Sequence, residues 1–135
     1  TSVHLTSFPE GEPVWRDEGL TARWERLLAY RSRVQGDLEI QRRDKVIGSS
    51  LEAHVQIEAG SDAYRFLTAY GGDLSAIFIV SRVTVKQAEM GPVDIRITVE
   101  RSDAPKCERC WNYREAVGKD TTHPTLCDRC VEAVR

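Results

Sequence analysis

Residues 106–130 read KCERCWNYREAVGKDTTHPTLCDRC, and this stretch holds all four cysteines of the chain. The cysteines form two pairs with two residues inside each pair, and sixteen residues separate the pairs. A two-residue gap lets both sulfurs of a tight turn face one ion, and two such turns complete a tetrahedron with metal–sulfur distances of about 2.3 Å. This spacing is typical of structural zinc sites. It predicts one structural zinc ion held by Cys107, Cys110, Cys127 and Cys130.

Three other uses of these thiols compete with structural zinc. Disulfide bonds need an oxidising compartment, and no basic start followed by an apolar segment indicates export. A catalytic zinc keeps one coordination position open, whereas four thiolates leave none. A rubredoxin-type iron centre would use the same four ligands for electron transfer, and it stays open as an alternative.

The region around the cysteines is poor in apolar residues, so metal binding would supply its folding free energy, on the order of 10 kcal/mol. Arg109 and Arg129 lie inside the two cysteine pairs, and Trp111 and Asn112 follow the first pair. An indole beside a guanidinium suits an unpaired RNA base. The alternative for Trp111 is that it packs under the metal site as core. Residues 101–135 carry seven basic and six acidic side chains, so any RNA recognition must be local.

Length and composition describe an ordinary soluble domain. The chain has 135 residues, 41% of them hydrophobic and 30% charged, with a net charge of −2. The longest apolar run covers residues 76–80, far short of the roughly 20 residues that cross a bilayer. We expect a cytoplasmic protein without membrane contact. The chain begins without methionine, which processing or excision from a longer polypeptide would explain.

The first half of the chain reads as a loop followed by a long helix. Residues 1–19 have the proline and glycine content of a linker. A helical period then begins at Thr21 and ends at Gly48. The apolar stripe of this predicted helix consists of Leu20, Trp24, Leu27, Leu28, Val34 and Leu38.

The period changes after Gly48 and indicates three strands. Apolar and polar residues alternate over 51–59 and over 93–99, and a second strand is predicted over 77–85. Ser61 and Asp62 supply cap chemistry for a short helix that runs to Tyr70. We expect an α+β fold: a long helix packs on a small, mostly antiparallel three-stranded sheet with a short helix, followed by a small treble- or ribbon-like zinc module with four cysteine ligands.

The pattern predicts three parts. They are an extended linker strap over 1–19, a helix plus β-α-β-β junction domain over 20–101, and a four-cysteine zinc-binding module over 102–135.

Several stretches of this sequence resemble one family. KCERCW at 106–111 and LCDRC at 126–130 resemble the zinc-binding C-terminus of bacterial-type isoleucyl-tRNA synthetases. SVHL at 2–5, and KVIGSSLEA at 45–53, resemble the end of the anticodon-binding region and the segment that follows it in that family. The resemblance covers the chain nearly end to end and in the same order.

The resemblance implies the C-terminal portion of an ATP-dependent class I ligase. The ATP-site motifs and the editing domain of that family are absent from this sequence, so it implies no catalytic residue here, and ATP belongs to the parent enzyme only. The implied partners are the upstream catalytic and editing domains and the anticodon stem-loop of isoleucine tRNA, with the zinc module reaching the loop. Our candidate RNA contacts are Arg109, Trp111, Asn112, Arg129, Arg42, Arg43 and Lys45.

Two other functional classes share the cysteine spacing. Formamidopyrimidine-type DNA glycosylases end in a similar zinc finger, but they begin with Pro-Glu, whereas this chain begins with Thr-Ser. We therefore expect no DNA binding. The remaining alternative is a zinc ribbon for protein–protein contact, in which Trp111 would anchor a protein partner.

Overall fold

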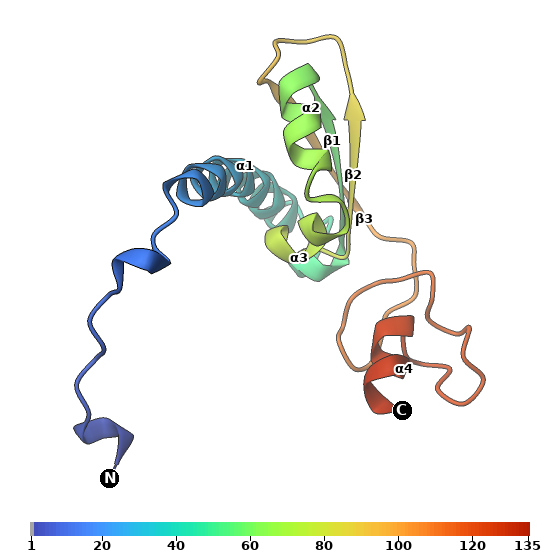
Figure 1. Cartoon of the computed structure of the whole chain (residues 1–135). Helices are drawn as coiled ribbons and strands as arrows, with labels where there is room; N and C mark the ends of the chain where they lie inside the picture. Colours follow the sequence, from blue (N-terminus) through green and yellow to red (C-terminus); the bar gives the residue numbers. More distant parts are fainter. Residues whose placement is uncertain (1) are drawn as a thin grey trace.

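The computed structural model describes residues 2–135; Thr1, the first residue of the predicted strap, lies outside the described residues. The strap contains two 3-10 turns, η1 (Val3–Leu5) and η2 (Pro13–Trp15), and its side chains are exposed. It runs away from the remainder of the chain (Figure 1). The three-part division of the chain stays a prediction.

Helix α1 (Glu18–Arg43) begins and ends earlier than the sequence period predicts. Asp17 caps its first turn, because its carboxylate accepts a hydrogen bond from the backbone N–H of Leu20 at 2.8 Å. The helix ends well before Gly48, and Lys45 then adopts a left-handed φ of 59°.

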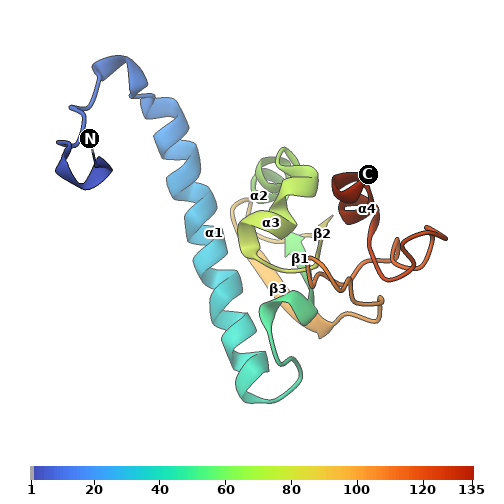
Figure 2. The ribbon, with the colours of Figure 1, turned by 90° about the horizontal axis from the view of Figure 1, so that it is seen from below.

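Only part of the predicted apolar stripe of α1 is buried. Its buried members are Leu27, Val34 and Leu38, and Tyr30, which the stripe omitted, is buried with them. The predicted burial of Leu20, Trp24 and Leu28 is wrong, because these side chains are 42–44% exposed. The first turns of α1, which carry Leu20 and Trp24, project beyond the sheet and its other helices (Figure 2). Leu28 lies beside the fully buried Leu27 but points to another side of α1.

The α+β fold class is confirmed, with a mixed three-stranded sheet. Strand β1 (Ala53–Ala59) lies in the middle, parallel to β2 (Arg82–Gln87) and antiparallel to β3 (Ile95–Arg101). The expectation of a mostly antiparallel sheet is thus met by one of the two strand pairs. The chain returns to the sheet through helices between β1 and β2, which is how parallel neighbours are joined.

The predicted strand over 77–85 is wrong in its first half. After α2 (Ser61–Thr68) and the turn η4 (Gly71–Asp73), residues Leu74–Phe78 form the short helix α3. Leu74 and Phe78 lie one helical turn apart and are both buried. A short apolar run fits a buried helix as well as a buried strand, so its period could not separate the two. Strands β1 and β3 also start later than expected, because 50–52 form the turn η3 (Ser50–Glu52) and Val93 precedes β3.

The three helices α1, α2 and α3 cover one face of the sheet. Val55 and Ile57 of β1 are buried beneath them, whereas His54 and Glu58 on the opposite face are partly exposed. Arg26 fastens α1 to α2, since its guanidinium donates to Asp62 at 2.6 Å. The four-cysteine module follows β3 and ends in α4 (Asp128–Val134), at the end of the sheet remote from α2 (Figure 1). In the described part of the chain, no helix has the length and hydropathy to span a membrane.

Adjacent leucines of α1 test this packing. Leu27 is fully buried and Leu28 is 43% exposed. We expect Leu27→Ala to lower the free energy of unfolding by about 2–5 kcal/mol, because it removes core contacts and leaves a cavity. The matched variant Leu28→Ala should cost less than about 1 kcal/mol. Urea unfolding followed by circular dichroism measures both, and equal losses would contradict the packing described.

Candidate metal centre

The first cysteine pair lies on a tight turn after β3. The backbone N–H of Trp111 donates to the carbonyl of Cys107 at 2.9 Å, and the N–H of Cys107 donates to the carbonyl of Asn112 at 2.9 Å. These bonds close the turn around Cys107 and Cys110. Trp111 completes it with a positive φ of 64°, which is rare for a residue other than glycine.

The second pair lies at the start of α4, where Cys127 is the residue before the first helical turn. A backbone hydrogen bond from Glu108 to the carbonyl of Thr125, at 3.1 Å, joins the two turns. The N–H of Cys127 also donates to the sulfur of Cys107 at 3.3 Å. The two turns therefore face each other with their thiols between them.

The structure brings all four cysteines together. Their sulfurs lie within 4.8 Å of one another, and those of Cys110 and Cys127 are 3.7 Å apart. A tetrahedral zinc site with bonds of about 2.3 Å places its sulfurs about 3.8 Å apart. All four are free thiols, too far apart for the disulfide bond of about 2.05 Å. The donor set and its spacing therefore fit one zinc ion.

The electrostatics of the cluster also favour a cation. Burial raises the pKa of Cys107, but hydrogen bonds from the backbone of Cys110, Cys127 and Arg109 outweigh it and lower the pKa to about 6. Burial raises the pKa of the Cys127 thiol to about 12. Neighbouring thiolates repel each other, so four of them can coexist only around a positive ion.

Little else holds this module together. Its buried cluster consists of Cys107, Cys127 and Cys130, with Val117 and Leu126 partly buried against them. The main hydrophobic core of the chain is a separate cluster built from α1, the sheet, α2 and α3. The sulfurs thus occupy the place that apolar side chains take in a larger domain.

Trp111 lies at the surface of the module, which rules out the core alternative. Its side chain is 61% exposed, and the ammonium of Lys106 lies 5.6 Å from its ring centroid. Asn112 donates to the carbonyl of Cys110 at 3.2 Å, and Arg109 donates to the sulfur of Cys130 at 3.6 Å. Both residues therefore support the metal site. Whether any of them contacts RNA stays a prediction.

The predicted RNA contacts do not form one cluster. Arg129 lies exposed on the first turn of α4, whereas Arg42, Arg43 and Lys45 lie at and just beyond the end of α1. Arg42 is engaged by Glu39, whose carboxylate accepts two hydrogen bonds at 2.7 and 2.8 Å. The structure thus separates the helix-end cations from those of the module.

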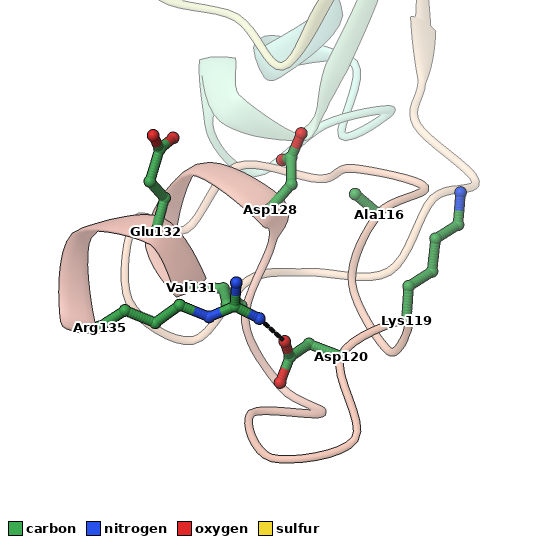
Figure 3. Close-up of a pocket in the computed structure, with 7 residues that line it drawn as sticks. All are labelled: Ala116, Lys119, Asp120, Asp128, Val131, Glu132 and Arg135. Carbon is green, nitrogen blue, oxygen red and sulfur yellow. Dashed lines mark hydrogen bonds and ion pairs between the residues drawn. The ribbon is translucent and has the colours of Figure 1, made fainter.

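A cavity of about 450 Å³ in the module does not suit a polyanion. The carboxylates of Asp120, Asp128 and Glu132 surround it (Figure 3). Arg135 donates to Asp120 at 2.9 Å and so ties the end of α4 to the preceding loop (Figure 3). Lys119 is the other cation that lines this cavity, and it faces three carboxylates.

Ser81 joins the module to the sheet, and the sequence did not single it out. Its side chain is buried, and its hydroxyl donates to the carbonyl of Leu51. The same oxygen accepts a hydrogen bond from the backbone N–H of Tyr113 at 2.7 Å. Next to it, Arg82 pairs with Glu115 at 3.1 Å. A serine at the start of a strand carries no local signal for such a role.

Comparisons with known proteins agree with these features. A family model described as "Zinc finger found in FPG and IleRS" matches residues 105–133. The whole chain is 46% identical to isoleucine–tRNA ligase of Geobacter sulfurreducens and covers 15% of that protein. Ninety-nine per cent of the chain aligns with the ligase of Moorella thermoacetica at 38% identity, covering 16% of it. The chain therefore spans less than a fifth of these relatives, and the predicted resemblance to isoleucyl-tRNA synthetases is confirmed along its length.

Amide exchange tests the role of Ser81. Ser81→Ala leaves the partly buried N–H of Tyr113 without its acceptor, at a cost of about 1–3 kcal/mol. We expect exchange of the Tyr113 amide to become roughly 5- to 150-fold faster, while the Cys107 amide is unchanged. Ser75→Ala is the control, since the Ser75 hydroxyl bonds the nearby carbonyl of Gly72 and not the module. Unchanged protection at Tyr113 would show that Ser81 does not hold the module.

Proposed function

We propose that this chain is the C-terminal tRNA-binding portion of an isoleucine–tRNA ligase. The observation that carries the proposal is an exposed Trp111 held on a compact four-cysteine turn, in a chain similar along its whole length to such ligases. Aminoacylation, with its use of ATP, would belong to upstream catalytic and editing domains of a longer cytoplasmic enzyme. The part described here would bind and orient RNA without a catalytic residue.

Zinc in this site would stabilise the fold of the module and would take no part in catalysis. Cys107, Cys110, Cys127 and Cys130 would fill all its coordination positions, so it would have no open position for chemistry. Its binding would supply the free energy that the small cluster of Val117 and the cysteines lacks. The ion would thereby fix the turn that displays Trp111.

RNA recognition would be local and would involve the anticodon stem-loop of isoleucine tRNA. The chain carries a net charge of −2, so it exerts no general attraction on a polyanion. An unpaired base can stack on the exposed indole of Trp111, with Lys106 beside the ring and Arg129 on the neighbouring helix. Such stacking suits the unpaired bases of a loop, which a duplex does not offer.

The two alternatives differ in the partner that they require. The family description names FPG as well as IleRS, so the module alone does not choose between DNA and RNA. The similarity of the whole chain to isoleucine–tRNA ligases supports RNA. A gel shift with isoleucine tRNA, duplex DNA and no nucleic acid, repeated at several salt concentrations, separates these classes.

We expect one zinc ion per chain. Chelation should unfold the module but leave the α1–sheet unit folded, because the two buried clusters are separate. Zinc binding should stabilise the folded module by on the order of 10 kcal/mol. Elemental analysis and backbone amide NMR measure this, with Cys110→Ser as the ligand variant and Thr121→Ala as the control. Iron in place of zinc, or a module that keeps its fold without metal, would refute the assignment.

Trp111→Ala should weaken binding of isoleucine tRNA by the full-length enzyme. One lost stacking contact costs about 1–3 kcal/mol, which is roughly 5- to 150-fold in Kd. Zinc content should stay the same, because the indole is exposed. Val134→Ala, which changes another exposed apolar side chain of the module, should leave the Kd unchanged. Unaltered binding by Trp111→Ala, measured by fluorescence anisotropy, would exclude the proposed contact.

A further inference from the structure

A second site lies where α3 meets the four-cysteine module. A cavity of about 160 Å³ opens there between the two. One wall comes from α3 and the residues that follow it, and the other comes from the module. The residues that define this site, which we call the seam, are Ile79, Asn112, Arg114 and Arg129.

The two arginines of the seam are free to bind an anion. Among residues 2–135, no carboxylate lies within 4 Å of the guanidinium of Arg114 or Arg129, which form no ion pair. The arginines around them are occupied: Arg82 and Arg135 pair with carboxylates, and Arg109 bonds a sulfur. Both seam arginines therefore lack a carboxylate partner at contact distance among the described residues, although Glu115 and Asp128 line a neighbouring cavity with Arg114.

Arg114 lies partly buried in the wall of this cavity. Its Nε is buried and has no hydrogen-bond partner among the residues that the structure describes. A buried donor without an acceptor costs about as much as a lost hydrogen bond, so such groups are uncommon and call for an explanation. Because this Nε is inaccessible even to water, the outer nitrogens of the Arg114 guanidinium would hold a phosphate in the cavity, together with Arg129.

Ile79 forms the edge of the seam and has an unusual backbone. It ends α3 with a left-handed φ of 59°, a conformation that a β-branched residue rarely adopts. Glycine would relieve this strain, yet the position carries an apolar side chain that is 47% exposed. The same residue borders a second cavity of about 300 Å³, which Arg42 also lines. Ile79 thus lies between the seam and a cavity at the end of α1, where Arg42 is paired with Glu39.

We propose that the seam binds the sugar–phosphate backbone of RNA. Arg114 and Arg129 hold a phosphate in the cavity, and Ile79 packs against the adjoining ribose. This inference rests on the proposed function, since Asn112 of the seam directly follows Trp111, so that one strand reaches both. It adds Arg114 and Ile79, which the sequence did not single out, to the RNA-binding surface.

The salt dependence of tRNA binding tests the phosphate contact. Arg114→Gln and Arg129→Gln are made in the zinc-loaded full-length enzyme, and Kd for isoleucine tRNA is measured between about 50 and 200 mM salt. Each variant should bind at least roughly fivefold more weakly. The plot of the logarithm of the association constant against the logarithm of the salt concentration should become less steep, by roughly 0.7–0.9 in slope for each lost contact. Arg65→Gln is the control, because Arg65 is exposed on α2, at the opposite end of the sheet (Figure 1).

Ile79→Gly separates binding from folding. This variant removes backbone strain, so it should leave the melting temperature and zinc content intact while weakening tRNA binding. Wild-type Kd and slope in both arginine variants would overturn the seam, even if Trp111→Ala still weakens binding. If the wild-type enzyme does not bind isoleucine tRNA, the proposed function fails, and the seam fails with it.

Discussion

The convergence of four cysteine sulfurs is the interaction on which the module depends. Residues 102–135 bury little else: Val131 is buried, and Val117 and Leu126 pack partly buried against the sulfur cluster. Four thiolates repel one another unless a cation lies between them, and backbone N–H groups offset only part of that repulsion. Both turns, and every side chain that they display, therefore depend on this one cluster.

The module and the sheet are separate cores joined by a few polar contacts. The Ser81 hydroxyl serves as donor to Leu51 and as acceptor for Tyr113, and the Arg82–Glu115 pair lies beside it. Hydrogen bonds need particular angles, so these contacts define the orientation of the module relative to the sheet more strictly than apolar packing would. They set the orientation of the module and, with it, the shape of the seam.

Charge on this molecule is organised locally. Acidic side chains surround the cavity of about 450 Å³ in the module, whereas two arginines line the seam between the module and α3. The net charge of −2 is a sum over the whole chain, so it does not reveal this local separation of acidic and basic side chains. In the proposed complex, RNA would meet a few guanidinium groups and one indole, whereas the acidic cavity offers a polyanion no favourable contact.

The features that were predictable are those encoded within a few residues. The spacing of Cys107 and Cys110, and the same spacing of Cys127 and Cys130, indicates a metal site because each turn is local. Alternation over 51–59 likewise identified the central strand. The apolar run at 76–80 fits either period, so only packing against α1 could show that its first residues are helical.

Other features depend on parts of the chain that meet only in the folded molecule. Leu27 and Leu28 are neighbours in sequence, but they point to different sides of α1, so packing buries one of them and leaves the other exposed. Ser81 meets the N–H of Tyr113 across 32 residues, and the Nε of Arg114 is buried without an acceptor, among the described residues, only because of what surrounds it. Local spacing and period can be read from the residues themselves, whereas the pairing or exposure of a side chain depends on long-range packing that no short pattern contains.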